Sequence, residues 1–301
     1  MKILVTGAWQ CTPEQLKALE DIGNEIVFMQ NEKDALPVSP CEIDGTICNG
    51  LFLYHKIESF TNLKYIQLTS AGFDRVPMDY VKEKGIQIYN ARGVYSIPMA
   101  EFALFGVLQL YKQGKFFFKK QAEHSWDKHR GLLELYSKRV CIVGCGNVGT
   151  ECAKRFSAFG CLTYGVDLFP RKDDNYTEMY PLSELDDAIS AADIIVLTLP
   201  LTEETKHLFN SDKFSKMKKG AVILNLTRGA VIDTKALIEV LGSHLGGAVL
   251  DVFDEEPLNE HSPLWDFENV ILTPHNSFVG EGNKERLWEV ILYNLKGKHY
   301  D

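Results

Sequence analysis

Two patterns of apolar and polar residues alternate along this chain. Short apolar runs predict strands, and between them apolar residues recur at the three- and four-residue spacing of amphipathic helices. In the N-terminal third, the expected strands are residues 2–7, 26–29, 46–48, 65–68 and 86–89. Because strands that alternate with helices form parallel sheets, this third predicts a small α/β domain.

A second series of strands begins near Arg139. The apolar runs predict one strand on either side of a glycine turn and four more strands beyond it, with helical patterns between them. Six parallel strands are the number expected of a doubly wound Rossmann sheet. The four later strands are expected at residues 193–199, 221–226, 248–253 and 270–273.

The glycine turn is the most specific motif in the chain. Gly144, Gly146 and Gly149 form a complete G-x-G-x-x-G that follows an apolar run and opens a helical pattern. Such a turn brings backbone N–H groups and a helix N-terminus close to a pyrophosphate. Asp167, at the end of the next strand, stands close to where the ribose-binding acid is expected. The motif therefore predicts dinucleotide binding in preference to a purely structural turn.

Residues 95–121, between the two series, are strongly apolar and predict one long helix that begins near Pro98. A helix so apolar is buried on more than one side, so it lies between domains or packs against a second subunit. We expect a homodimer on this ground.

The order of the elements predicts an α/β protein of two domains. Residues 98–277 are expected to form a Rossmann dinucleotide-binding domain, inserted into a smaller flavodoxin-like parallel-sheet substrate domain. The substrate domain is expected to consist of residues 1–97 and 278–301, with an amphipathic return helix at residues 285–295.

Charge and hydropathy argue against two classes of partner, nucleic acids and membranes. The formal net charge of −9 argues against a nucleic acid, which calls for a basic patch. No apolar run approaches the roughly 20 residues that span a bilayer, and the apolar start at residues 1–5 is too short for a signal sequence. We expect neither a nucleic acid nor a membrane as partner.

The seven cysteines are scattered singly, without a C-x-x-C pair, and indicate reduced thiols in a cytoplasmic protein. Cys145, inside the glycine turn, is interpreted as a small residue beside the cofactor in preference to a reactive thiol. No cluster of His, Cys and Asp has ligand spacing, so no metal site is expected.

Three of the late strands end in polar residues suited to chemistry. Arg228 lies in L-T-R-G, Glu256 in D-V-F-D-E-E-P and His275 in T-P-H-N-S. Taken singly, they have ordinary explanations as a surface ion pair, a solvated acidic turn and a structural histidine. Together, each at the carboxyl end of a Rossmann strand, they indicate a catalytic set.

These motifs resemble those of the D-isomer-specific 2-hydroxyacid dehydrogenases, in which an N-R-G-type arginine, a D-V-F-x-x-E-P glutamate and a T-P-H histidine form the catalytic set. The resemblance covers nearly the whole chain, including the S-A-G-F-D loop at residues 70–74, the N-A-R-G-V-Y-S-I-P-M-A-E-F-A-L segment at residues 90–104, and Trp126. It implies reversible NAD-dependent reduction of a 2-oxo acid to the D-2-hydroxy acid.

The resemblance also implies a role for each catalytic residue. His275 would protonate the carbonyl oxygen of the substrate as hydride arrives, and Glu256 would hydrogen-bond His275 and favour its charged form. Arg228 would hold the substrate carboxylate with its fork of donors. The loop that would bind the same carboxylate through backbone N–H groups comprises Ser70, Ala71 and Gly72.

The cofactor site implied by the resemblance lies at the glycine turn and at the strand ends. Asn147 and Val148 would approach the pyrophosphate, Asp167 would bind the adenosine ribose, and Asp251 would face the carboxamide. The whole expected set is Gly144, Gly146, Asn147, Val148, Gly149, Asp167, Pro200, Thr205, Thr227, Arg228, Asp251, His275 and Ser277.

The sequence departs from the family pattern in two places, after Asp167 and after His275. The carboxylate of Asp167 favours NAD(H), because it repels a 2′-phosphate. NADP(H) stays possible because Arg171 and Lys172 follow, although they lie beyond Pro170 and are expected to point to solvent. Phe278 and Gly280 stand where the family often has small residues and Thr, so the contacts after His275 are left open.

The substrate pocket is expected from residues 49–55, Phe73 and Tyr95, which are aromatic and largely uncharged. A phosphorylated substrate needs two or more positioned Arg or Lys donors. The pocket therefore favours small unphosphorylated acids such as glyoxylate, hydroxypyruvate or pyruvate. D-3-phosphoglycerate dehydrogenase is the chief alternative, with Arg92 or Lys64 reaching the substrate.

Two rival functions come from other protein classes. An NAD(H)-sensing corepressor-like binding protein would share the fold, but the complete catalytic set argues against it. An L-specific dehydrogenase is disfavoured, because its glycine fingerprint would lie near the N-terminus and not beyond residue 140.

Overall fold

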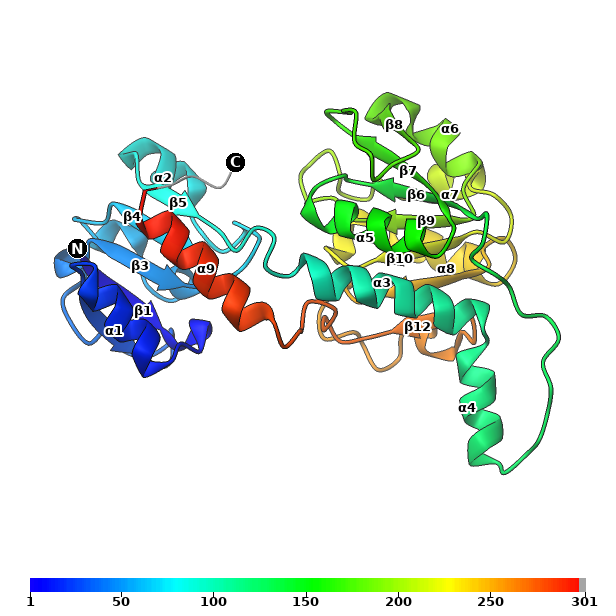
Figure 1. Ribbon diagram of the computed structural model, residues 1–301, viewed down its shortest axis with the longest axis horizontal. Helices are drawn as coiled ribbons and strands as arrows, with labels where there is room; N and C mark the ends of the chain where they lie inside the picture. The colour runs from blue at the N-terminus through cyan, green and yellow to red at the C-terminus, as the bar shows by residue number, and fades with distance from the viewer. Residues whose placement is uncertain (298–301) are drawn as a thin grey trace. The chain divides into compact units, whose positions relative to one another are not determined.

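The computed structural model describes residues 1–297 and divides into two compact units (Figure 1). The smaller unit combines Met1–Tyr95 with the C-terminal segment that starts at Gly280, and the larger unit, Ser96–Val279, is inserted between these two pieces. Each unit contains one parallel sheet with helices on both faces, which confirms the expected two-domain α/β fold.

The sheet of the smaller unit has five parallel strands in the order β2-β1-β3-β4-β5. The chain therefore reverses its direction of growth between β1 and β3, and open α/β sheets bind ligands beyond the carboxyl ends of the strands at such a point. The strands are β1 (Lys2–Thr6), β2 (Glu25–Met29), β3 (Gly45–Cys48), β4 (Tyr65–Leu68) and β5 (Gln87–Tyr89).

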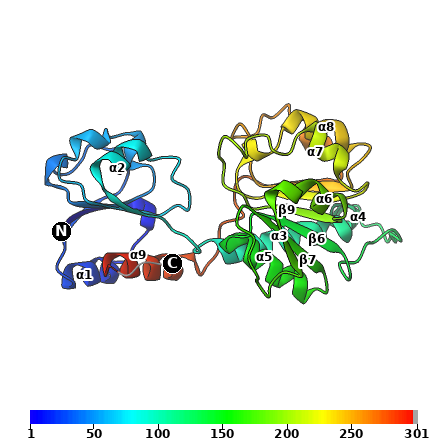
Figure 2. The ribbon, with the colours of Figure 1, turned by 90° about the horizontal axis from the view of Figure 1, so that it is seen from above.

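Helices α1 (Pro13–Asp21) and α9 (Asn283–Leu295) cover one face of this sheet, and α2 (Met78–Lys84) lies on the other (Figure 2). A capping box between Thr12 and Gln15 starts α1. The apolar side of α9 joins the core of β1, and Trp288 stacks on Trp9 with ring centroids 5.5 Å apart. Short 3-10 turns are η1 (Gly7–Trp9), η2 (Pro40–Glu42), η3 (Leu51–Leu53) and η4 (Ile57–Ser59).

The sheet of the larger unit has seven parallel strands in the order β12-β11-β10-β9-β6-β7-β8. The six expected strands are present as β6 (Arg139–Val143), β7 (Leu162–Asp167), β9 (Ile194–Leu197), β10 (Val222–Asn225), β11 (Gly247–Leu250) and β12 (Val270–Leu272). The seventh, β8 (Glu178–Pro181), was not expected. It is a partly exposed edge strand that ends in proline, so it lacks the apolar run that marks the others.

Helices cover both faces of this second sheet. Alternate residues of its central strands face α3 (Ser96–Tyr111) and α5 (Asn147–Ala158) on one side. The other residues face α6 (Leu185–Ser190), α7 (Ser211–Lys216) and α8 (Thr234–Leu241). Burial on both faces explains why these strands are short, almost wholly apolar runs. The 3-10 turns of this unit are η5 (Leu182–Glu184), η6 (Gly229–Val231) and η7 (Pro263–Asp266).

The apolar segment after Pro98 is two helices, so the prediction of one long helix was wrong. The chain breaks after α3 at Gln113, whose φ of 55° is left-handed, and continues as α4 (Gly114–Ala122). Helix α3 is buried within the larger unit: a Cβ added at Gly106 would lie 2.6 Å from Val249. This close packing on the sheet accounts for most of the apolar character of α3.

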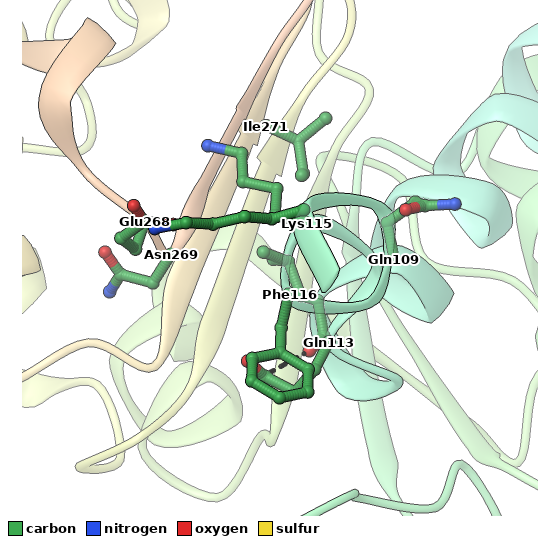
Figure 3. A pocket seen from close by; sticks show the side chains of 9 residues that line it. Gln109, Gln113, Lys115, Phe116, Glu268, Asn269 and Ile271 are labelled. Carbon is green, nitrogen blue, oxygen red and sulfur yellow. Dashed lines mark hydrogen bonds between the residues drawn. The ribbon is translucent and has the colours of Figure 1, made fainter. Parts of the chain in front are cut away.

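Helix α4 projects from the larger unit (Figure 1). At its first turn, Lys115 donates a hydrogen bond of 3.2 Å to the carbonyl of Phe267. A hollow of about 330 Å³ lies here, between α4 and the end of the sheet at Ile271 (Figure 3). Within residues 1–297, no helix is both long and apolar enough to cross a bilayer.

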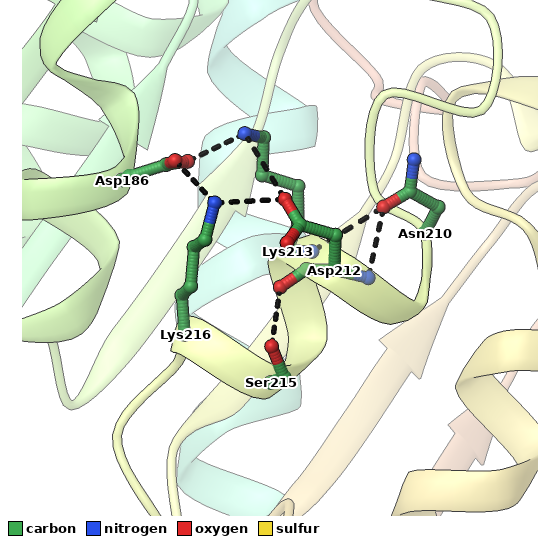
Figure 4. A network of polar contacts seen from close by, with 6 residues as sticks. All are labelled: Asp186, Asn210, Asp212, Lys213, Ser215 and Lys216. Carbon is green, nitrogen blue, oxygen red and sulfur yellow. Dashed lines mark hydrogen bonds and ion pairs between the residues drawn. The ribbon is translucent and has the colours of Figure 1, made fainter.

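A network of charges ties α6 to α7 (Figure 4). Asp186 accepts hydrogen bonds from Lys213 at 2.5 Å and from Lys216 at 2.6 Å, and Lys216 also reaches Asp212 at 2.8 Å. Lys213 first, and then Lys216, holds the pKa of the Asp186 carboxyl below its ordinary value. None of these four residues belongs to the expected catalytic set.

Candidate active site

The glycine turn joins β6 to α5, and its three glycines are required for different reasons. Gly144 has a left-handed φ of 97°, and a Cβ there would lie 2.9 Å from the backbone of Thr198. A Cβ at Gly149 would lie 2.2 Å from the carbonyl oxygen of Gly144. A Cβ at Gly146 would meet nothing within 4 Å. The space in front of Gly146 therefore lets a pyrophosphate approach the N-terminus of α5, next to Asn147 and Val148.

The carboxylate of Asp167, at the end of β7, lies against this turn. Its Oδ2 accepts a 2.7 Å hydrogen bond from the backbone N–H of Cys145, and its Oδ1 accepts one from Phe169. Arg171 bends back over the same turn and donates to the carbonyl of Cys145 at 2.9 Å. The expectation that Arg171 points to solvent therefore holds only in part: its side chain is 51% exposed, but the guanidinium is bound to the turn and also reaches Asp173.

Cys145 has the character of a packing residue. Its side chain is fully buried, and its thiol faces the carbonyls of Ile142 and Val166. Burial raises the pKa of this thiol to about 11. A thiol that stays protonated at neutral pH is a poor nucleophile, which agrees with its interpretation as a small residue within the turn.

Two predicted catalytic residues meet at the carboxyl edge of the larger sheet. Glu256 follows β11 and His275 follows β12, and Nδ1 of His275 lies 2.9 Å from Oε2 of Glu256. The other oxygen of Glu256 accepts a hydrogen bond from the backbone N–H of Phe253. A carboxylate accepts only, so Nδ1 carries a proton and Nε2 is left to exchange a proton with a ligand.

Asp251 fixes the backbone around His275. It is fully buried at the end of β11, and its carbonyl accepts from the N–H of His275 at 2.7 Å. Its carboxylate accepts from the hydroxyl of Thr273 at 2.6 Å and from the N–H groups of Asn276 at 2.8 Å and Ser277 at 2.9 Å. Sequence reasoning assigned Asp251 to the cofactor and missed this positioning role, for which the signal in the sequence is only an acid directly after an apolar strand.

Arg228 follows β10, the strand beside β11. Asn225 shapes this turn by donating to the carbonyl of Arg228 and accepting from the N–H of Thr227. A Cβ at Gly229 would lie 1.9 Å from the carbonyl carbon of Phe253, so the turns after β10 and β11 pack directly on each other. The larger unit therefore brings the segments of all three predicted catalytic residues to one edge of its sheet.

Two predicted cofactor residues have unsatisfied buried hydroxyls. The Oγ1 of Thr227 and the Oγ of Ser277 are buried without a hydrogen-bond partner among the described residues. Buried polar atoms usually have partners, so such atoms fit a polar ligand that completes them. The open space at Gly146 and these two hydroxyls together make the site suitable for a dinucleotide.

Thr205 and Pro200 build the loop after β9. Thr205 is buried, and its hydroxyl donates to the carbonyl of Pro200 at 2.7 Å and accepts from the N–H of Thr202 at 2.8 Å. The hydroxyl of Thr205 therefore shapes the loop.

The predicted carboxylate-binding loop lies in the smaller unit, directly after β4. Ser70 donates to the carbonyl of Gly72 at 3.1 Å, and Asn90 donates to the carbonyl of Ala71 at 2.6 Å. The backbone N–H groups of Ala71 and Gly72 donate no hydrogen bond within residues 1–297. They are thus suited to an anionic group. No group of three His, Cys, Asp or Glu in the described part of the chain could hold a metal ion.

Comparison with known proteins identifies the family. Residues 104–277 match the model of the D-isomer specific 2-hydroxyacid dehydrogenase NAD-binding domain. The chain is 33% identical over 246 residues to a glyoxylate reductase of Thermofilum pendens, which covers 79% of this chain and 73% of the relative. The chain belongs to the D-isomer specific 2-hydroxyacid dehydrogenase family. It is an NAD-dependent oxidoreductase, and the larger unit contains its NAD-binding domain.

Two further similarities are informative. A D-3-phosphoglycerate dehydrogenase of Methanocaldococcus jannaschii is 30% identical over 301 residues, which cover 98% of this chain and 57% of that relative. A crystal structure of a D-isomer specific 2-hydroxyacid dehydrogenase family protein from Aeromonas salmonicida has 28% identity and a TM-score of 0.85, covering 100% of this chain and 97% of the other. The similarity in fold thus extends over both units.

Proposed function

We propose that this protein reduces a small, unphosphorylated 2-oxo acid to the D-2-hydroxy acid with NADH, and that glyoxylate or hydroxypyruvate is the substrate. The observation that carries the proposal is the His275–Glu256 hydrogen bond of 2.9 Å at the carboxyl edge of an NAD-binding sheet. The glyoxylate reductase among the relatives supports the same substrate class.

In the proposed mechanism, NADH supplies a hydride to C2 of the oxo acid when it is bound. His275 donates the proton on Nε2 to the carbonyl oxygen, and Glu256 holds the ring through Nδ1 and stabilises its positive charge. Arg228 holds the carboxylate of the substrate and polarises its carbonyl. In the smaller unit, the N–H groups of Ala71 and Gly72 are the donors suited to a substrate carboxylate, so residues 1–97 and 278–301 act as the substrate domain.

The same proposal gives each cofactor residue a task. Residues 98–277 act as the dinucleotide domain: Gly146, Asn147 and Val148 hold the pyrophosphate. Asp167 binds the adenosine ribose with carboxylate oxygens that already lie at the turn, and this favours NADH over NADPH. Arg171, which bends over the same turn, is the residue through which NADPH would bind. The residues that would line the remainder of the cofactor site are Pro200, Thr205, Thr227, Asp251 and Ser277.

A kinetic panel tests the proposed substrate. Glyoxylate, hydroxypyruvate, pyruvate and 3-phosphohydroxypyruvate are compared by kcat/KM, first with NADH and then with NADPH. We expect the highest value for glyoxylate or hydroxypyruvate with NADH. A preference for the phosphorylated acid would support phosphoglycerate oxidation, the second candidate, which the relative from Methanocaldococcus jannaschii favours.

We further propose that the protein is a homodimer that pairs through α4 and the segment after it. Large apolar side chains are exposed there: Phe118 is 62%, Trp126 95% and Tyr136 74% exposed. A helix that projects from its own unit and carries exposed aromatic rings is best covered by a second copy of the chain.

We also propose a cytoplasmic location. All seven cysteines are unpaired, and five of them, Cys48, Cys141, Cys145, Cys152 and Cys161, are buried thiols with a raised pKa. Unpaired cysteines are typical of the reducing cytoplasm.

A further inference from the structure

An acidic side chain occupies the anion-binding position of the smaller unit. Glu32, in the loop after β2, accepts hydrogen bonds from the backbone N–H groups of Asn49 at 2.6 Å and Gly50 at 2.7 Å. The hydroxyl of Thr6, at the end of β1, donates to it at 2.8 Å. The donors come from the ends of β1 and β3, between which the sheet changes direction. This is the crevice where open sheets of this order bind anionic ligands.

Neutral donors alone hold this carboxylate. Among residues 1–297, no Lys, Arg or His side chain forms an ion pair with Glu32. The neighbouring Lys33 lies instead over the ring of Tyr54, and Nε2 of His55 meets the backbone carbonyl of Glu32 at 2.9 Å. Within residues 1–297, no ion pair therefore neutralises the negative charge of Glu32, although Arg75 packs beside the same loop, with its Cδ 3.8 Å from where a Cβ at Gly50 would lie.

The crevice lies beside the loop proposed to bind the substrate carboxylate. The N–H of Thr69 donates to the carbonyl of Cys48 at 2.9 Å, which places the ends of β4 and β3 side by side. Asn49 follows Cys48 and Ser70 follows Thr69, and neighbouring strands lie about 4.8 Å apart. A 2-oxo acid whose carboxylate binds at Ala71 and Gly72 would thus lie beside the loop that carries Asn49, Gly50 and the charge of Glu32.

We propose that Glu32 acts as an internal anion that fills this position and excludes 2-oxo acids with a second anionic group, such as a phosphate, sulfonate or further carboxylate. The inference rests on the proposed function and deepens it by assigning the residue that selects the substrate class. Glu32 disfavours a phosphate for two reasons. The N–H donors of Asn49 and Gly50 are already bound to its carboxylate, so they cannot bind a phosphate. The negative charge of Glu32 also repels a phosphate next to it.

The test compares the full-length protein with Glu32→Ala, Glu32→Gln and a control, Glu58→Ala, which removes an exposed acid of the same unit. The first readout is the ratio of kcat/KM for 3-phosphohydroxypyruvate to that for hydroxypyruvate. We expect this ratio to rise about tenfold or more in both Glu32 variants, since neighbouring like charges repel each other, and to stay unchanged in the control. A residue that only shapes the loop would leave the ratio unchanged.

The second readout needs no catalysis: it is the change in Tm with inorganic phosphate at constant ionic strength. Phosphate should raise the Tm of Glu32→Ala, whose N–H donors are vacated, by more than it raises that of the wild type or of Glu58→Ala, because all three proteins share the anion-binding groups at Gly72 and Gly146. If the wild type reduces none of the acids, the proposed function fails while this readout still tests Glu32. If Glu32→Ala does not fold, the ratio in Glu32→Gln decides. An unchanged ratio in the folded Glu32 variants, or equal stabilisation of the wild type by phosphate, would overturn the proposal.

Discussion

His275 has a backbone conformation that its surroundings must enforce. Its φ of 50° is left-handed, which costs a residue with a Cβ about 1–2 kcal/mol. Asp251 accepts four hydrogen bonds from this segment, including one from the N–H of His275 itself. The T-P-H motif predicted which residue carries the chemistry, but the left-handed turn and the buried acid beneath it depend on contacts between two strands that spacing does not reveal.

Replacing Asp251 with Asn should disturb this support. The amide would turn an N–H donor toward backbone N–H donors, so at least one buried hydrogen bond is lost. We expect kcat to fall by about tenfold to a hundredfold, the effect of displacing a catalytic group by about 1 Å, together with a lower Tm. Steady-state kinetics and thermal unfolding measure both effects, with Glu255→Gln, an exposed acid nearby, as the control. Normal turnover in Asp251→Asn would show that Asp251 does not position His275.

Replacing Glu256 with Gln should slow the reduction. Glu256 lies 2.9 Å from Nδ1 of His275, and its negative charge stabilises the positive ring that donates the proton. The amide oxygen of Gln can still accept from Nδ1 but carries no charge, so we expect kcat to fall by about tenfold or more while the Kd for NADH changes little. Steady-state kinetics and fluorescence titration measure the two quantities, again with Glu255→Gln as the control. An unchanged kcat in Glu256→Gln would show that Glu256 does not act through His275.

At the scale of elements, the sequence predicts strands most accurately when all residues of the strand are buried. Strands β9 and β10 are buried at every residue, so their apolar runs were sufficient to find them. The edge strand β8 was missed because its residues are partly exposed. The break between α3 and α4 was missed because the apolar residues continue through it, while the turn depends on the left-handed backbone of Gln113.

The glycine turn gives a prediction at this scale. Substitutions at two of its glycines should have different effects, one on NADH affinity and the other on thermal stability. In Gly146→Ala the new Cβ faces open space, so Tm should hold while the Kd for NADH rises about tenfold, or about 1.4 kcal/mol. In Gly149→Ala the Cβ collides with the carbonyl of Gly144, so Tm should fall by several degrees, because overpacking costs about 1–3 kcal/mol.

Fluorescence titration with NADH and thermal unfolding measure the two effects. Gly242→Ala is the matched control, because its Cβ also meets nothing within 4 Å and its φ is negative. Unchanged NADH affinity in Gly146→Ala would contradict the assignment of this turn to the pyrophosphate.

At the scale of the whole molecule, the alternation of strands and helices and the position of the glycine motif predicted an insertion of one α/β unit into another. The apolar content of the segment after Pro98 predicted burial, but it could not show that α3 is buried on its own sheet while α4 projects. Of the large apolar residues in this segment, Phe105 of α3 is 48% exposed, and Phe117 and Phe118 of α4 are 39% and 62% exposed.

A charged side chain introduced at Phe118 of α4 should dissociate the proposed dimer into monomers. We expect Phe118→Glu to sediment as a monomer at micromolar concentration, because a carboxylate would be buried without a partner between the two copies. The wild type should sediment as a dimer. Phe159→Glu is the control, since Phe159 is 48% exposed at the end of α5 and should leave the dimer intact. A monomeric wild type would refute the homodimer.

The central claim is that His275 supplies the proton that turns a 2-oxo acid into its alcohol, and turnover in His275→Gln tests it most directly. Glyoxylate and hydroxypyruvate reduction are followed through the oxidation of NADH, and NADH binding is measured separately by fluorescence. The account predicts that kcat falls by about 10² to 10⁴-fold, the usual contribution of a general acid, while the Kd for NADH changes little. Turnover close to that of the wild type would contradict the account.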